Sequence, residues 1–180
     1  RTHMLSLKLF RAANRQFEFH FFDAKTRDEF MRQSFADTKF LEIYERSIFG
    51  PSGSDLFRYG CLYKLGGVYF DISKAVFSRP LLSYCPPGCT ELLTYERTYI
   101  EPETSPGLKD LLRTDRLFAQ WGLGFAAQHP ILSTLINQIE NDFDDFVGKK
   151  FNNPKRAILE FSGPIAFTRS VRKYLRLHPG

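Results

Sequence analysis

One continuous segment, residues 54–71 (SDLFRYGCLYKLGGVYFD), joins a helical pattern to an apolar strand through two glycines. Ser54 is a favoured helix N-cap residue, and Asp55 in the first turn suits the positive end of a helix dipole. Gly66 and Gly67 can take the left-handed backbone conformation that ends many helices. The segment therefore predicts a helix that begins at Ser54, ends at the glycines and is followed at once by a strand.

The predicted helix is apolar on nearly all of its surface. Leu56, Tyr59 and Tyr63 share one face, and Leu62 and Leu65 extend the apolar surface around the helix. A helix of this kind is buried on most of its sides.

The strand after the glycines carries an acid at its carboxyl end. Residues 68–70 are apolar, and Asp71 follows them directly. Ligands of open α/β sheets collect at the carboxyl ends of the strands. Asp55 and Arg58 lie three positions apart on the helix, so they share one of its sides. Two carboxylates, a guanidinium and the Tyr69 ring can therefore converge on one pocket rim, which suits sugar hydroxyls and a diphosphate.

Each of these residues also has a purely structural explanation. Asp55 and Arg58 can form an ordinary i,i+3 ion pair, worth only about 0.3 kcal/mol. Asp71 can simply end a strand, and Tyr69 can belong to the core. Taken singly, each residue favours the structural explanation, whereas the four together favour a binding site.

The rest of the chain mixes helix and strand patterns without an internal repeat. Residues 17–22 (FEFHFF) alternate as a strand does, with Phe17, Phe19 and Phe21 on one face. The other expected elements are short helices over 26–35 and 38–48, a loop at 51–53, short strands over 92–95 and 121–126, a loop at 102–107, and helices over 110–117, 130–147 and 167–175. This mixture predicts one α/β domain over residues 1–180.

The composition fits one folded domain and no nucleic-acid binder. The chain has 180 residues, of which 43% are hydrophobic and 16% aromatic, enough for a single core. Its net charge of +5 is modest, and the basic runs at 149–150, 155–156 and 169–176 are scattered. We interpret these runs first as solvated surface. The second interpretation is a weak patch for peripheral contact with an anionic membrane or for an anionic substrate. No apolar run reaches membrane-spanning length, and nothing near Arg1 resembles a signal peptide.

The three cysteines do not form a disulfide framework. Cys61 lies within the apolar helix and is interpreted as a small core residue. The Cys85-Pro-Pro-Gly-Cys89 spacing suits either a disulfide or half of a metal site. Since no second Cys or His pair lies nearby, zinc is disfavoured, and the redox compartment stays open.

The 54–71 segment resembles the DXD-containing sugar-binding region of the family 32 glycosyltransferases. These include α-1,6-mannosyltransferase-like and capsular polysaccharide synthesis proteins, and the glucosylating clostridial toxins are more distant relatives. The matching residues follow the family pattern without a gap: Ser54, Asp55, Arg58, Leu62, Gly66, Gly67, Tyr69 and Asp71. Residues 17–30, 120–132 and 162–168 resemble other parts of the family more loosely.

The resemblance implies a GT-A-like (Rossmann-like) α/β fold, with a mostly parallel sheet flanked by helices in one domain. It implies transfer of a sugar from a UDP- or GDP-sugar donor to a hydroxyl of a glycan, lipid-linked or protein acceptor, with retention of configuration. A catalytically silent sugar-nucleotide-binding module or partner subunit is the alternative. A bacterial member would lie in the cytoplasm or at the membrane periphery, and a eukaryotic member in the Golgi lumen.

The family's site residues carry over by position. Asp55 would hydrogen-bond the hydroxyls of the donor sugar, Arg58 would contact the sugar or diphosphate, and Tyr69 would line the donor pocket. Asp71 would meet the ribose and the metal shell, so Asp71 and Arg58 are the expected catalytic residues. Trp121 is a further donor-binding candidate because an indole can stack on a sugar or base, although a lone Trp beside Gly122 belongs to the core as often.

Ser73 departs from the family pattern, which places a metal-ligating acid there. A neutral hydroxyl is a poorer ligand for Mg²⁺ or Mn²⁺ than a carboxylate, so Asp71 and Ser73 should hold such an ion only weakly. Farther along, His129 is expected at the start of a helix, with a metal or phosphate contact as the less favoured role. Residues 162–164 (Ser-Gly-Pro) are interpreted as a turn first and a donor-site loop second.

Overall fold

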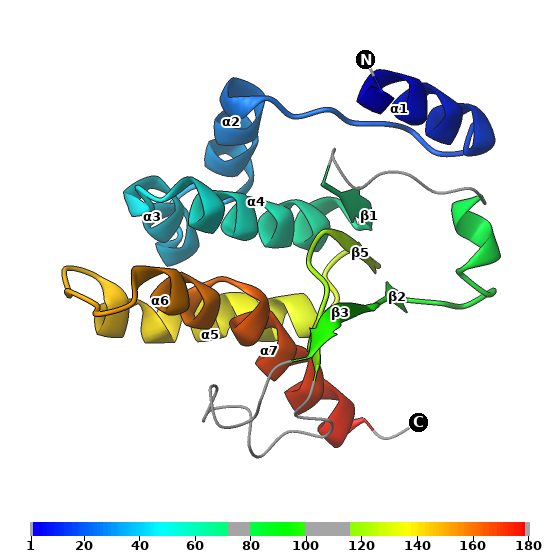
Figure 1. Cartoon of the computed structure of the whole chain (residues 1–180). Helices are drawn as coiled ribbons and strands as arrows, with labels where there is room; N and C mark the ends of the chain where they lie inside the picture. The colour runs from blue at the N-terminus through cyan, green and yellow to red at the C-terminus, as the bar shows by residue number, and fades with distance from the viewer. Residues whose placement is uncertain (1, 72–79, 100–115, 179–180) are drawn as a thin grey trace.

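The computed structural model describes residues 2–71, 80–99 and 116–178 (Figure 1). The helices are α1 (Thr2–Ala13), α2 (Ala24–Ser34), α3 (Lys39–Arg46), α4 (Gly50–Leu65), α5 (Pro130–Phe146), α6 (Pro154–Phe161) and α7 (Pro164–Leu177), with a short 3-10 turn, η1, at Leu81–Ser83. The strands are β1 (Gly67–Phe70), β2 (Glu91–Leu92), β3 (Tyr95–Tyr99), β4 (Arg116–Phe118) and β5 (Gly122–Phe125).

The strands form two small sheets. In the first, β5 lies between β1 and β2 and runs antiparallel to both. In the second, β3 pairs antiparallel with β4. The mixed α/β character is thus confirmed, but the expected mostly parallel sheet is not present among the described strands. That expectation came from the resemblance, whereas these short strands each find a neighbour that runs in the opposite direction.

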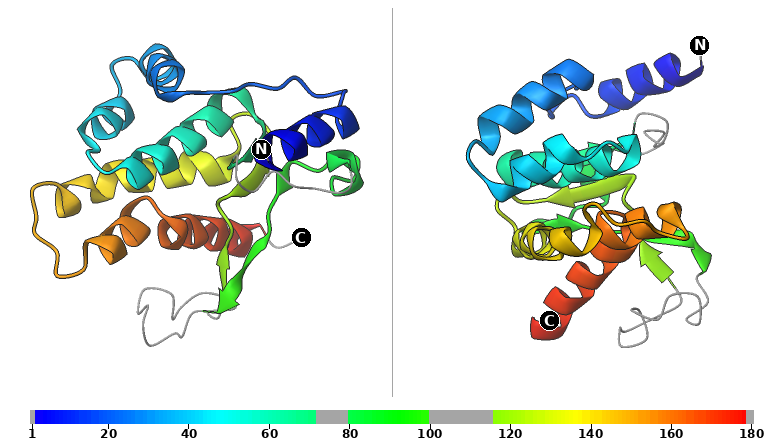
Figure 2. Two further views of the ribbon diagram at one scale, coloured as in Figure 1. Left: turned by 45° about the horizontal axis from the view of Figure 1, so that its top comes forward. Right: turned by 90° about the vertical axis from the view of Figure 1, so that its left-hand side faces the viewer.

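Helix α4 lies in the middle of the helical part. Figure 1 shows it between α2 and α3 on one side and α5, α6 and α7 on the other, with the sheet of β1 and β5 at its carboxyl end. Figure 2 gives the same arrangement from two further directions. Within the described ranges, no helix is both long and apolar enough to cross a membrane.

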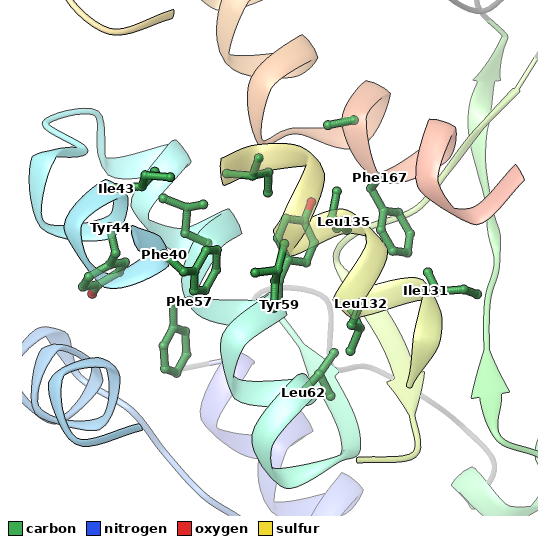
Figure 3. Packing of buried hydrophobic residues seen from close by; sticks show 14 of the residues in the cluster. Phe40, Ile43, Tyr44, Phe57, Tyr59, Leu62, Ile131, Leu132, Leu135 and Phe167 are labelled. Carbon is green, nitrogen blue, oxygen red and sulfur yellow. The ribbon is translucent and has the colours of Figure 1, made fainter. Parts of the chain in front are cut away.

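The hydrophobic core gathers where these helices meet (Figure 3). Tyr59 of α4 is fully buried, and its ring stacks on Phe167 of α7 at a centroid separation of 5.9 Å. Leu132 and Leu135 of α5 and Phe40 of α3 contribute further buried side chains. The expectation that the 54–65 helix is packed on most sides is therefore confirmed.

Helix α4 begins earlier than predicted. It starts at Gly50, after Phe49 as the N-cap, and includes the residues expected to form a loop. Pro51 fits the first turn because its missing N–H would have no helical partner there. Ser54 lies inside the helix, and its hydroxyl donates to the Gly50 carbonyl oxygen at 3.0 Å. The prediction of Ser54 as the N-cap is therefore wrong.

Residues 17–22 do not form the predicted strand. Their aromatic rings pack on neighbouring helices instead: Phe19 lies edge-on to Phe10 at 5.9 Å, and Phe22 to Phe57 at 5.0 Å. The alternating pattern identified side chains that need apolar contacts, but a strand also needs a neighbouring backbone.

Most of the other expected elements are present. Helices α2, α3, α5 and α7 and strands β1 and β5 match predictions, while residues 92–95 span the end of β2 and the start of β3. Helices α1 and α6 were not predicted. Residues 102–107 and 110–115 lie outside the described residues, and Leu117, expected at a helix end, belongs to strand β4.

Candidate functional site

Four side chains from one continuous segment meet where the carboxyl end of β1 lies beside the Asp55–Arg58 part of α4. Asp55 and Arg58 come from α4, Tyr69 comes from β1, and Asp71 follows that strand. Arg58 lies between the two acids: its Nη1 is 3.3 Å from Asp55 Oδ1, and its Nη2 is 3.5 Å from Asp71 Oδ1. The Tyr69 hydroxyl donates to Asp71 Oδ1 at 3.0 Å, and the guanidinium lies 5.2 Å from the centroid of the Tyr69 ring.

The cluster passes from a buried part to an accessible part. Asp55 and Arg58 are each 7% exposed, whereas the side chain of Asp71 is 37% exposed. Asp55 and Arg58 thus form the floor of the cluster, and Asp71 lies where a ligand can reach it.

Burial controls the ionisation of the floor. It raises the pKa of Asp55 to about 7, because desolvation of the carboxylate outweighs the attraction of Arg58 and the hydrogen bond from Ser162. Burial alone would lower the pKa of Arg58, but the neighbouring acids and tyrosines reverse this effect and raise it. Arg58 is therefore a permanent cation, while Asp55 can change charge near neutral pH.

A second hydrogen-bonded group supports the buried acid. The Ser162 hydroxyl, at the turn between α6 and α7, lies 3.4 Å from Asp55 Oδ2 and 3.0 Å from Ser52 Oγ. The Tyr59 hydroxyl donates to the Ser162 carbonyl oxygen at 2.7 Å, and Gln120 donates to the Tyr59 hydroxyl. The turn expected at residues 162–164 is confirmed, and this turn contacts Asp55.

The segment before β5 holds the other side of the cluster. The Gln120 carbonyl oxygen accepts from Arg58 Nη1 at 3.2 Å, and the Trp121 carbonyl oxygen accepts from the Asp71 backbone N–H at 2.9 Å. Sequence patterns identified neither Gln120 nor Ser52 as part of this site.

His129 has a structural role in α5. It is the N-cap, its Nδ1 accepts from the Ile131 N–H at 3.2 Å, and its Nε2 lies 3.3 Å from Glu91 Oε2. Its expected place at the start of a helix is confirmed.

A cavity of about 480 Å³ lies beside the cluster. Its walls come from α1, residues 17–22, α4 and β1, and they include Phe10, Phe19, Phe57 and Tyr69. Tyr69 lines the cavity and also contacts Asp71, so this residue separates the cavity from the rest of the four-residue cluster, whose other members do not line it.

Comparisons with known proteins show which family the chain resembles. Residues 1–86 match the family described as "Glycosyltransferase sugar-binding region containing DXD motif". All four residues of the cluster lie within the matched range. The similarity to family 32-like glycosyltransferases is confirmed.

Two individual proteins extend the similarity beyond the matched range. The chain is 26% identical over 152 residues to the initiation-specific alpha-1,6-mannosyltransferase of Schizosaccharomyces pombe, covering 82% of this chain and 38% of that protein. The structure is also similar to the PaToxG glycosyltransferase, with a TM-score of 0.60 and 15% identity over 97% of this chain and 64% of the other. The chain thus spans less than half the length of the curated mannosyltransferase.

The roles expected for two of the site residues, Trp121 and Ser73, remain predictions. Trp121 is half-buried, and it contacts the cluster through its backbone carbonyl oxygen, which accepts from the Asp71 N–H. Ser73 lies outside the described residues.

No group of three or more His, Cys, Asp or Glu side chains able to hold a metal occurs in residues 2–71, 80–99 and 116–178. The described part of the cluster offers one accessible carboxylate, Asp71, which is already paired with Arg58, and so it does not fit a preformed site for a divalent ion.

Proposed function

We propose that this chain carries the donor site of a glycosyltransferase that uses a nucleotide-diphosphate sugar. The observation that supports this most directly is the position of Arg58, a buried cation held between two carboxylates at the carboxyl end of β1. A fixed guanidinium can bind a phosphate or sugar oxygen without first being ordered, which lowers the cost of binding.

Each member of the cluster has a proposed role. Asp55 accepts hydrogen bonds from hydroxyls of the donor sugar, while Arg58 contacts the sugar or the diphosphate. Tyr69 forms the wall between this cluster and the neighbouring cavity, and it orients Asp71 through their 3.0 Å hydrogen bond. Asp71, the accessible acid, lies nearest to the reacting part of the donor. Trp121 is a further candidate for stacking on the sugar or base.

The proposed reaction transfers the sugar to a hydroxyl of a glycan, lipid-linked or protein acceptor with retention of configuration. In this proposal the chain acts by holding donor and acceptor together and by stabilising charge on the leaving diphosphate. Arg58 supplies that stabilisation. Since the described acids do not form a metal site of their own, we derive no step through Mn²⁺ or Mg²⁺. Any such ion would depend on phosphate oxygens of the donor.

Calorimetric titration with a panel of UDP- and GDP-sugars tests the donor site. Asp55→Ala and Arg58→Ala should each weaken binding of the preferred donor by about 10- to 150-fold, the equivalent of losing about 1.5–3 kcal/mol from a charged hydrogen bond. Arg46→Ala is the matched control, because Arg46 forms an exposed i,i+4 pair with Glu42 on α3. Unchanged donor affinity in both site variants would refute this assignment.

Hydrolysis of the donor distinguishes the enzyme from its alternative. An enzyme should release free sugar slowly from its donor even without an acceptor, and Asp71→Asn should stop this release. Specific donor binding with no hydrolysis or transfer would instead identify a silent sugar-nucleotide-binding module.

A further inference from the structure

We propose that Cys85 and Cys89 form a reversible dithiol–disulfide pair. This proposal does not depend on the glycosyltransferase function, because neither residue belongs to the candidate donor site. Both cysteines lie in the connection between η1 and β2, and both are reduced in the structure.

A tight turn brings the two thiols together. Residues 86–89 (Pro-Pro-Gly-Cys) form the turn, which is closed by a 3.0 Å hydrogen bond from the Cys89 N–H to the Pro86 carbonyl oxygen. Gly88 has φ +83°, as expected for the third residue of a type II turn that has proline before it. The Cys89 thiol donates to the Glu91 carbonyl oxygen at 2.9 Å. Burial, and after it the neighbouring Cys89 thiol, raises the pKa of Cys85, so the two side chains lie near each other across this turn.

Both ends of the connection are fixed. On one side, the Leu81 N–H donates at 2.7 Å to Oδ1 of Asn14, the residue after α1, and Asn14 is fully buried. On the other side, the Thr90 carbonyl oxygen accepts from the Ala126 N–H at 2.7 Å, and β2 then pairs with β5. A disulfide across the turn would therefore form without moving either anchor, which is the condition that engineered disulfides often fail to meet.

The two thiols differ in access, and this sets the order of the chemistry. Cys89 is exposed, whereas Cys85 is half-buried. With glutathione disulfide as the oxidant, the Cys89 thiolate attacks one glutathione sulfur and releases the other as a thiolate. The Cys85 thiolate then attacks the Cys89 sulfur, which forms the internal disulfide and releases the second glutathione. Two cysteine thiols are oxidised, one glutathione disulfide is reduced, and the two protons end on the glutathione thiols.

The test is thiol trapping of the whole chain in buffers that range from reduced to oxidised glutathione. N-ethylmaleimide followed by intact-mass measurement counts the free thiols. Wild type should lose two of its three free thiols together, without a retained glutathione, and peptide mapping should find Cys85 joined to Cys89. Cys61→Ser is the matched control, because Cys61 lies in α4, and it should oxidise at the same glutathione ratio as wild type.

Two further variants make the result decisive. Cys85→Ser should accumulate glutathione on Cys89, because the second thiol is no longer present to expel it. Gly88→Ala strains the turn without creating a clash, since no atom lies within 4 Å of the added Cβ. It should require a roughly 5-fold more oxidising glutathione ratio, as expected for strain in a left-handed backbone position. Persistent alkylation of both cysteines, or a stable glutathione adduct on wild-type Cys89, would overturn the proposal.

Discussion

Asp55 is a buried acid whose ionisation should make stability depend on pH. Its pKa rises from 3.8 when unfolded to about 7 in the folded protein. The folded state therefore holds a proton that the unfolded state releases between these values. The stabilisation from this group is complete below pH 4 and is lost as pH rises through 7, by up to about 4 kcal/mol.

Thermal unfolding of wild type and Asp55→Asn across pH 4–8 checks this prediction. The wild-type protein should lose more stability over this range than the variant, which cannot release the proton. Asp144→Asn is the control, because the side chain of Asp144 is 80% exposed. Parallel pH profiles for wild type and Asp55→Asn would contradict the raised pKa.

Asp71 should matter for turnover more than for folding. Asp71→Asn keeps the shape of the side chain but removes the charge paired with Arg58, and the site is partly open to water. We expect loss of transfer or donor hydrolysis with a melting temperature within about 4 °C of wild type, since partly exposed ion pairs contribute only about 1 kcal/mol. A variant with near-full turnover would show that Asp71 merely ends a strand.

The sequence predicted the four-residue cluster because its members lie on one short segment with fixed helix and strand geometry. It did not predict Gln120, and it identified Ser162 as part of a turn first and of a donor-site loop second. Gln120 is 62 residues from Arg58, and Ser162 is 107 residues from Asp55. Contacts between such distant residues depend on how the helices pack, which no local pattern encodes.

At the scale of elements, the junction between α4 and β1 depends on two glycines with different surroundings. Both have positive φ values, +67° for Gly66 and +89° for Gly67, so alanine is strained at either position. At Gly66 an added Cβ would also lie 2.6 Å from the Ala127 backbone nitrogen, whereas at Gly67 it meets nothing within 4 Å.

Urea unfolding of the two alanine variants separates strain from steric overlap. Gly67→Ala should lose about 1–2 kcal/mol of unfolding free energy from strain alone. Gly66→Ala should lose clearly more, because the Ala126–Ala127 backbone must also move. Equal losses of unfolding free energy would contradict this expectation, because the backbone at residues 126–127 would then move without a cost in free energy.

The observed ends of the elements agree with the sequence-based predictions only where the backbone requires one type of residue. Gly66 and Gly67 ended α4 as predicted, because few other residues adopt their backbone angles. The start of α4 was misplaced because both Pro51 and Ser54 are acceptable near a helix start, and packing selected the earlier one. The mostly parallel sheet was expected from the resemblance and not from the residues, and it is the expectation from which the described strands differ most.

At the scale of the whole molecule, the core predicts one cooperative unit. The larger of two buried clusters includes side chains from α2, α3, α4, α5 and α7 and from β4 and β5. Unfolding in urea should therefore give the same midpoint when it is followed by Trp121 fluorescence and by helical circular dichroism. Two separated midpoints would contradict the single domain predicted from the sequence.

The open side of β1 has a consequence for how molecules meet one another. Among the described strands, β1 pairs with a neighbour, β5, along one edge only, and the residues of β1 line the 480 Å³ cavity together with residues 17–22. A strand edge of this kind is a template for an extended peptide from another molecule. The unpaired edge of β1 should thus favour self-association at high protein concentration. Light-scattering intensity should then rise more than in proportion to the protein concentration.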